Sequence, residues 1–434
     1  MTTIVVSPIS SLLTDHSSTS AETSQPSPDY ESLHITPSHS SGTDFLTERF
    51  LDPEAFSSAQ LKLPEPDVDY LITRDVSDFV GDVPNIKAIS DQFFHSVHEW
   101  MPIVSKIQFR ANLVGWLTHK RAELFYLILA MKLSCEHAPG PRTPLYQITK
   151  LMQFRIENSG VLSLQVIQAS VLIAIYEMGH GIYPSAFLSI AGCARYATAL
   201  GIDKSILNND VNISWNELEE RRRVWWSILV LDRFLNLSNP SRHLVTPDTV
   251  LDNWLPVDDA AFNNGTARPE DAFTLGSATA LVLGRFARFA QAAHLLGQVL
   301  RHVAEGSTES ERAQLRRTIF SLSKYRDGPE ASIVSLDQLS TESSLISQTA
   351  LQMSVYVAQR AELEVRSRSS PFLLHLLYKV ALLYMKASQS TPGDSITDKL
   401  RVVKHGLEVL GRRWHIAQSY LSLLSRHEIM QAMQ

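Results

Sequence analysis

The sequence predicts an all-α fold, with one large helical domain behind a disordered N-terminal tail. Apolar residues recur at spacings of three and four over most of residues 86–426, which is the period of a helix that buries one or more faces. Strand-type alternation is rare and short, and no unit repeats at a fixed period of about 20 to 50 residues. Neither a sheet nor a solenoid is therefore predicted.

A short linker separates the tail from the domain. Residues 1–65 are rich in serine, threonine and proline and poor in large apolar side chains, so they bury too little surface to offset chain entropy. Residues 66–85 form the predicted linker, and residues 86–426 form the helical domain. A break near residues 326–340 could divide that domain into two lobes.

The negative charge of the chain is concentrated in the tail. The chain carries 39 Lys and Arg against 45 Asp and Glu, a formal charge of -6, whereas residues 1–61 alone hold eight acidic side chains and one basic one. The rest therefore sums to about +1, too little for the broad basic field that nonspecific DNA binding needs. Acidic-aromatic clusters such as TDFL (43–46) are typical of activation segments, although an idle solvated tail explains them more simply.

Cysteine usage and the lack of targeting patterns indicate an intracellular protein. Cys135 and Cys193 cannot build a disulfide framework, and no signal peptide pattern opens the chain. The longest apolar stretch, residues 161–178, is interrupted by serine, glutamine and glutamate. It is predicted as a buried helix, and no membrane span is expected.

Proline, glycine and the apolar period set the expected helices and loops. Pro184 begins a helix that Gly201 ends, and with the preceding helix it predicts an antiparallel pair joined by a short turn. The other helical stretches are 120–135, 272–304, 308–325, 340–366, 371–388 and 395–426. Loops are expected at 139–144, 239–256, 325–330 and 388–395.

One predicted helix changes character halfway along its length. Ser214 and Glu217 form an S-x-x-E capping box, which places the helix start at Ser214. Acidic residues in the first turn suit the helix macrodipole, and Glu217–Arg221 and Glu219–Arg223 are i,i+4 pairs in the better orientation. The charged half is therefore predicted to be a solvated helix entrance.

Two basic runs look like import signals or phosphate-binding patches. They are RRR, residues Arg221, Arg222 and Arg223, and GRR at 411–413. Ordinary helix surface explains both more simply, and that interpretation is favoured.

The second half of the same helix is apolar on nearly every face beyond Val224, so Trp225 and Trp226 are predicted to be buried. Asp232 and Arg233 lie within this apolar half. A buried carboxylate needs a partner, and losing that partner costs roughly 3 to 5 kcal/mol. A buried ion pair that fixes how helices meet is the favoured interpretation, and a polar anchor for a small effector is the alternative.

Aromatic and histidine side chains suggest further sites, and a structural role is favoured for each. Aromatic residues near this helix could line a ligand cavity, although core packing explains them better; they are Trp215, Trp225, Trp226, Phe234, Trp254 and Phe262. His180 is expected in a loop, and His98 and His375 in or beside the core. Metal, phosphate-loop, dinucleotide and hydrolase motifs are missing, so no metal site, cofactor or enzyme activity is predicted.

Four stretches, in order along the chain, resemble the fungal-specific transcription factor domain family, the helical regulatory region that follows a binuclear zinc cluster in many fungal regulators. They are DQFFHSVHEWMPIVSKIQF (91–109), GHGIYPSAFLSIAGCARYATALGIDK (179–204), ELEERRRVWWSILVLDRFLNL (217–237) and FLLHLLYKVALLYM (372–385). The third is the most recognisable, so the structural or regulatory candidates are Arg221, Arg222, Arg223, Trp225, Trp226, Asp232 and Arg233.

The sequence departs from the family in two places. Family members usually carry six cysteines that hold two zinc ions, whereas this sequence has Cys135 and Cys193 only, 58 residues apart, so that DNA-binding module is not expected. Ser238, Asn239 and Pro240 replace the usual GRP after the signature helix.

The resemblance implies a transcriptional regulator in the nucleus that acts through its helical domain. It would reach DNA through a DNA-binding partner or the transcription machinery, with a metabolic or secondary-metabolite gene cluster as the implied target. A small-molecule effector and a dimer are left open. Two alternatives stand beside this one: a truncated competitor of a complete zinc cluster regulator, and a helical small-molecule-binding protein or enzyme that reuses the domain.

Overall fold

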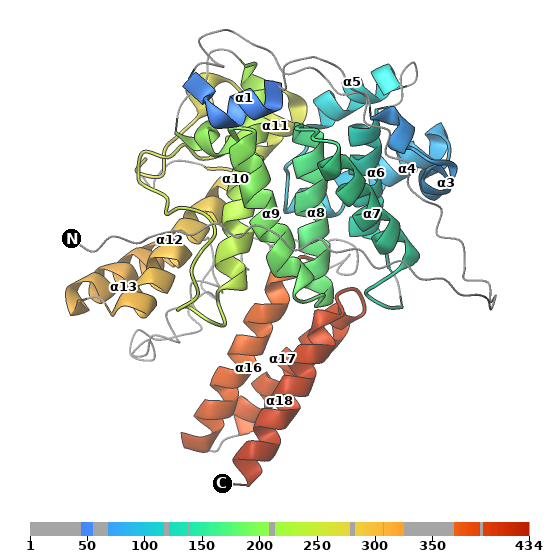
Figure 1. Cartoon of the computed structure of the whole chain (residues 1–434). Helices are drawn as coiled ribbons and strands as arrows, with labels where there is room; N and C mark the ends of the chain where they lie inside the picture. The colour runs from blue at the N-terminus through green and yellow to red at the C-terminus, as the bar shows by residue number, and fades with distance from the viewer. Residues whose placement is uncertain are drawn as a thin grey trace, which may run out of the picture. The chain divides into compact units, whose positions relative to one another are not determined.

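The computed structural model describes residues 45–54, 68–116, 121–137, 139–207, 213–277, 283–306, 308–324, 369–390 and 394–433. In these ranges the regular structure is helical, with one isolated bridge between Trp254 and Thr274 and no sheet, which confirms the all-α prediction. The chain divides into two units, Met1–Pro64 and Glu65–Gln434. Helix α1 (Phe45–Leu51) belongs to the first, and the other described helices belong to the second (Figure 1).

Helical structure begins before residue 86, where the sequence places the start of the domain. The first elements are η1 (Asp69–Leu71), α3 (Arg74–Val80) and α4 (Val83–Phe94). Val76 and Val80, one helical turn apart, are fully buried, and Asp82 caps α4 by accepting a hydrogen bond from the Asn85 amide at 3.1 Å. This short apolar face is too brief to stand out in the sequence pattern.

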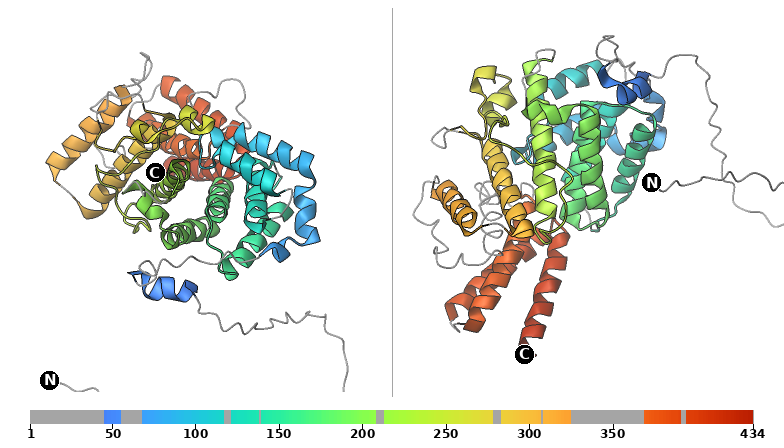
Figure 2. Two further views of the ribbon diagram at one scale, coloured as in Figure 1. Left: turned by 90° about the horizontal axis from the view of Figure 1, so that it is seen from above. Right: turned by 60° about the vertical axis from the view of Figure 1, so that its left-hand side comes forward.

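Helices α8 and α10 lie at the centre of the second unit. They follow η2 (Val97–Glu99), α5 (Lys106–Trp116), α6 (Ala122–Cys135) and α7 (Pro144–Asn158). α8 (Leu164–His180) is buried along most of its length and packs against α6 and α9 (Ser185–Ala199), with α10 (Trp215–Leu235) beside both α8 and α9 (Figure 2). Gly181, at a φ of +69°, ends α8, so the predicted helix pair and its turn are confirmed.

A long connection follows α10, and it extends further than predicted. The next elements are α11 (Asp259–Asn264), η4 (Pro269–Asp271), α12 (Arg285–Glu305) and α13 (Glu309–Lys324). The expected helix over 272–304 is wrong at its start, because residues 273–275 bond to the chain before α11 instead. The Leu255 amide donates to the Phe273 carbonyl at 2.8 Å, and the Leu275 amide donates to the Asn253 carbonyl at 2.9 Å.

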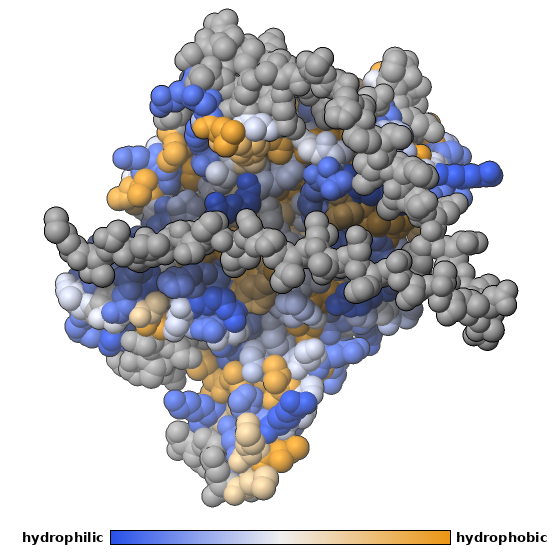
Figure 3. Space-filling model, viewed as in Figure 1, coloured by the Kyte–Doolittle hydropathy of each residue, from blue (hydrophilic) through white to orange (hydrophobic). Residues whose placement is uncertain are grey.

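Three helices close the chain: α16 (Phe372–Ser390), α17 (Asp394–Gly411) and α18 (Ile416–Ala432). The stretch 395–426 is thus two helices rather than one. The break between them places Trp414 in the core, where its indole nitrogen donates to the Ser369 carbonyl at 3.0 Å. On the face shown in Figure 3, apolar residues are interspersed with hydrophilic ones over these helices.

Aromatic rings join the C-terminal helices to the rest of the second unit. The ring of Phe372, at the start of α16, meets Phe234 of α10 in edge contact at 4.6 Å between centroids. The same ring also contacts Trp100 and Phe289, at 5.9 and 5.3 Å. The start of α16 therefore packs against α10, α12 and the chain before α5.

Gly179 in α8 leaves room for Trp414, and the contact yields a prediction. A Cβ atom at Gly179 would lie 2.3 Å from the Trp414 ring, whereas nothing lies within 4 Å of a Cβ atom built at Gly192 in α9. We expect Gly179→Ala to lower the free energy of unfolding by about 1 to 3 kcal/mol through overpacking. Gly192→Ala should be neutral or stabilising by up to about 1 kcal/mol. Equal midpoints for the two variants in urea unfolding would contradict the contact.

Several predictions fall outside the described residues. They concern most of the tail at 1–65, the break near 326–340 and the helix over 340–366.

Candidate functional site: the polar residues of helix α10

Helix α10 begins as predicted, but most of its charged half is buried. Ser214 caps the helix by accepting a hydrogen bond from the Glu217 amide at 3.3 Å, and Arg221 donates to the Glu217 carboxylate at 2.8 Å. The prediction of a solvated helix entrance is wrong for four of the charged residues. All four are buried: Glu219, Glu220, Arg222 and Arg223. The RRR run is therefore helix surface only at Arg221.

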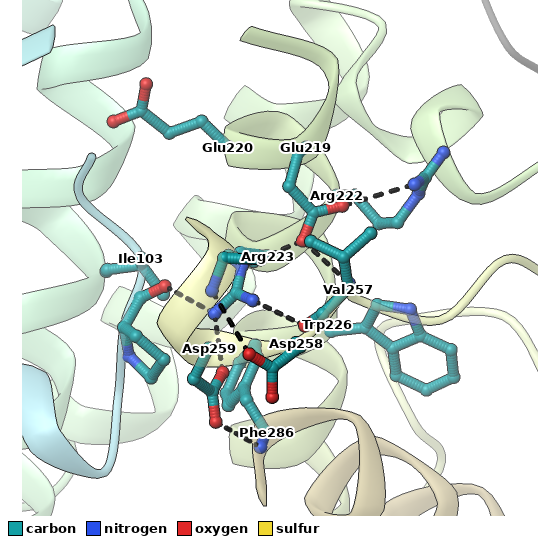
Figure 4. Close-up of polar contacts among 12 residues, drawn as sticks. Ile103, Glu219, Glu220, Arg222, Arg223, Trp226, Val257, Asp258, Asp259 and Phe286 are labelled. Atoms are coloured by element: carbon teal, nitrogen blue, oxygen red, sulfur yellow. Dashed lines mark hydrogen bonds and ion pairs between the residues drawn. The ribbon is translucent and has the colours of Figure 1, made fainter. Parts of the chain in front are cut away.

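Arg223 is the centre of a buried polar cluster (Figure 4). Its Nε donates to Glu219 Oε1 at 2.8 Å, its Nη1 to Asp259 Oδ1 at 2.9 Å and its Nη2 to the Val257 carbonyl at 2.7 Å. The guanidinium also stacks 4.0 Å from the centroid of the Phe262 ring. One fully buried side chain thus joins α10 to the segment that begins α11.

Glu219 neutralises two arginines at once. Its Oε2 accepts from Arg222 Nη1 at 3.2 Å, while Oε1 accepts from Arg223 and from the Val257 amide at 3.0 Å. Arg222 donates in addition to the Ser205 carbonyl at 3.2 Å in η3 (Ile202–Ile206). Burial lowers the pKa of Arg222, and the adjacent Glu219 carboxylate opposes that shift.

Asp259 connects the buried polar cluster to α12. Its Oδ1 accepts from Arg223, and its Oδ2 accepts from the Phe286 amide at 3.1 Å, in the first turn of α12. A carboxylate at the N-terminus of α12 accepts a hydrogen bond from an otherwise unpaired helix amide, and its negative charge is stabilised by the helix macrodipole. The cluster therefore positions three helices relative to one another: α10, α11 and α12.

Glu220 turns to the opposite side of α10. Its Oε1 accepts from the Ser105 amide at 2.8 Å and from Gln168 Nε2 at 2.7 Å, and the same Gln168 nitrogen donates to the Ile103 carbonyl at 2.8 Å. Burial raises the pKa of Glu220 to about 7, although both hydrogen bonds act in the other direction. This carboxyl ties α10 to α8 and to the chain before α5.

The raised pKa of Glu220 predicts a pH dependence of stability. The folded chain holds this proton to a higher pH than the unfolded chain does, so the contribution is full below the ordinary glutamate pKa and is lost as the pH rises through about 7. Glu220→Gln keeps the acceptor oxygen and cannot ionise. We expect it to reduce the fall in unfolding free energy between about pH 5 and pH 8, and to be the more stable form at pH 8 by on the order of 1 to 3 kcal/mol.

The control is Glu217→Gln, at a half-exposed position on the same helix. It removes a neighbouring charge that adds to the raised pKa of Glu220, so it should reduce the pH slope in urea unfolding, but much less than Glu220→Gln does. Parallel slopes for wild type and Glu220→Gln would contradict a titrating Glu220.

Asp232 and Arg233 form a second buried cluster near the end of α10. Asp232 Oδ2 accepts from the Thr246 amide at 2.9 Å and hydroxyl at 2.6 Å, and lies 3.6 Å from Arg233 Nη1. Arg233 donates to the Thr246 hydroxyl and, at 2.6 Å, to the Pro247 carbonyl. The predicted partner of Asp232 is thus confirmed, and both residues hold the loop after α10.

The aromatic residues near α10 pack mainly in the core. Trp225, Trp226, Phe234 and Phe262 are buried, while Trp215 and Trp254 are half-buried. Trp226 Nε1 donates to the Trp254 carbonyl at 2.9 Å. None of these six aromatic residues lines the pocket of about 350 Å³ that Val257 and Asp258 help to form, whereas Phe234 lines a smaller pocket of about 50 Å³.

The histidines occupy buried positions, and one prediction among them is wrong. His98 and His375 are buried as expected, with His98 Nε2 2.7 Å from Asn263 Oδ1. His180 is the last residue of α8 rather than a loop residue, and its Nδ1 lies 2.7 Å from His415 Nδ1. Arg413 of the GRR run is buried too and donates to the Ser134 carbonyl at 3.2 Å.

The described helices and side chains provide neither a metal-binding cluster nor a membrane-spanning segment. In the described ranges, no three His, Cys, Asp or Glu side chains come close enough together to hold a metal ion. None of the helices in the same ranges is long and apolar enough to cross a membrane.

Three relatives and one family model match this chain. The model described as "Fungal specific transcription factor domain" matches residues 91–356, more than half of the chain. Transcription factor BOA15 of Botryotinia fuckeliana is 33% identical over 180 residues, which cover 40% of this chain and 97% of that protein. No solved structure matches the chain significantly.

The other two relatives are longer than the region they share with this chain. Transcription factor tazR of Aspergillus terreus is 27% identical over 186 residues, and the pigment biosynthesis transcriptional activator pigB of Monascus ruber is 28% identical over 191 residues. Each alignment covers 40% of this chain, but only 29% of tazR and 34% of pigB. The family match over residues 91–356 shows that the chain belongs to the fungal-specific transcription factor domain family and is a transcriptional regulator.

Proposed function

We propose that this regulator acts in the nucleus on a group of secondary-metabolite genes and reaches them through a DNA-binding partner. The family match over residues 91–356 carries the proposal. The name of pigB, an activator of pigment biosynthesis, supports the class of target genes. The 97% coverage of BOA15 supports a regulator built largely on the region shared with this chain.

A partner is proposed because this sequence does not supply the family's zinc cluster. Its two cysteines, Cys135 and Cys193, are both buried, in α6 and α9 respectively. Burial raises the pKa of each thiol, which disfavours the thiolate that zinc requires. In this proposal the helical domain carries out no chemistry, since its most polar residues are used to join helices.

The decisive experiment is chromatin immunoprecipitation of the tagged chain, with transcript profiling of a deletion strain of the source organism. We expect enrichment at a limited set of promoters and a change in the transcripts of the same genes, restored by the wild-type chain. Removing the DNA-binding partner should abolish the enrichment. No promoter enrichment together with unchanged transcripts would overturn the proposal.

A further inference from the structure

We propose that a pocket between α8, α10, α16 and α18 binds a small neutral molecule that joins an apolar body to a hydroxyl or carbonyl oxygen. The inference deepens the proposed function, since it gives the regulator a place to receive a signal. The kind of molecule that binds is inferred from the residues that line this pocket, and not from the identity of the target genes.

The pocket lies where separate parts of the second unit meet. It has a volume of about 50 Å³, and its lining includes Phe234, Ser238, His375 and Tyr420. The lining residues come from the ends of α8 and α10, from the starts of α16 and α18, and from the chain directly beside these helices. A volume of this size exceeds the roughly 10 to 15 Å³ that a single water needs, so it encloses a few non-hydrogen atoms of a ligand.

One residue that lines the pocket, His375, has a buried ring nitrogen without a hydrogen-bond partner in the described part of the chain. His375 is 5% exposed, and its Nδ1 lies 3.2 Å from the Tyr420 hydroxyl. Its Nε2 has no hydrogen-bond partner among the described residues. Leaving a buried polar atom unsatisfied costs about 1 to 3 kcal/mol, so a bound oxygen that pairs with it stabilises the complex.

The lining selects against ions. Among the described residues that line the pocket, none carries a formal charge at neutral pH. Burial lowers the pKa of His375 to about 3, with the Lys379 charge acting in the same direction, so the ring is neutral. A charged ligand would lose its hydration without gaining a counter-charge. Apart from Ser238, the remaining walls are apolar or aromatic, as in most small-molecule sites.

Occupancy would couple the C-terminal helices to α10. The His375 ring lies 5.7 Å from the Phe234 ring and 5.8 Å from the Tyr420 ring, centroid to centroid. A molecule bonded to His375 would therefore contact residues on three helices at once. Because it binds only the folded arrangement, it raises the free energy of unfolding by an amount that grows with the logarithm of its concentration above the Kd.

The test uses 4-fluorophenol as the probe on the purified full chain, followed by fluorine NMR. We expect saturable binding at one site per chain. 4-Fluorotoluene, which lacks the hydroxyl, should bind about tenfold more weakly, and 4-fluorobenzoate, which is charged, should not bind. His375→Phe should reduce the affinity for 4-fluorophenol by about the same factor while leaving that for 4-fluorotoluene unchanged.

A second pair of variants avoids changes in the core. Ser238 is exposed and lines the pocket, whereas Ser241 is exposed and does not. Ser238→Trp should abolish binding by filling the pocket, and Ser241→Trp should retain it. No saturable binding, or equal binding by the two tryptophan variants, would overturn the site. Binding by a chain whose deletion leaves transcripts unchanged would support the site while overturning the regulatory proposal.

Discussion

Replacing Arg223 with alanine is expected to lower the free energy of unfolding by about 3 to 5 kcal/mol. The variant loses the ion pairs to Glu219 and Asp259 and the hydrogen bond to the Val257 carbonyl. It leaves a fully buried Glu219 with Arg222 as its remaining ion-pair partner and removes the stack on Phe262. Urea unfolding followed by circular dichroism measures the loss.

Arg221→Ala is the matched control on the same helix. Arg221 pairs with Glu217 at 2.8 Å, but both side chains are partly solvated, and such pairs contribute about 0 to 1 kcal/mol. If the two alanine variants unfold at the same urea concentration, the buried cluster does not hold these helices together.

Asp232→Ala is expected to cost a similar amount, about 3 to 5 kcal/mol, and to free the loop after α10. The variant leaves the buried Arg233 guanidinium without its carboxylate and removes the acceptor of the Thr246 amide and hydroxyl. Burial already lowers the pKa of Arg233, so the unpaired charge is costly. Hydrogen exchange at the Thr246 amide should become much faster than in the wild-type chain.

The control is Asp248→Ala, in the same loop. Asp248 pairs with Arg301 at 3.2 Å, with both side chains nearly half-exposed, so its loss should cost no more than about 1 kcal/mol. Similar destabilisation by Asp232→Ala and Asp248→Ala would contradict a structural role for the buried pair.

Local patterns were enough to predict much of the fold. The helix start at Ser214 depends on one hydroxyl and one nearby amide, and the burial of Trp225 and Trp226 follows from a continuous apolar run. The sequence predicts a partner for Asp232 because an ionised carboxylate buried in an apolar run is stable only when it is paired or hydrogen-bonded. Each of these inferences uses residues within a few turns of one another.

The environment of the charged half of α10 could not be predicted in this way. The length of the charged run and the spacing of its residues predict that the segment is exposed to solvent. Its partners, however, come from distant parts of the chain. Ser105, Gln168 and Asp259 lie 115, 52 and 36 residues from the side chains they contact. One signal was present: Glu219 stands three and four residues before Arg222 and Arg223, so one carboxylate can neutralise both in a buried setting.

The polar residues of α10 hold three separate loops through hydrogen bonds from loop amides. Hydrogen exchange measured residue by residue tests this arrangement most directly, at the amides of Ser105, Thr246 and Val257, which donate to Glu220, Asp232 and Glu219 respectively. We expect these loop amides to exchange as slowly as amides in the middle of α10, because they open only when the helices separate. Exchange at the rate of exposed loop amides would contradict it.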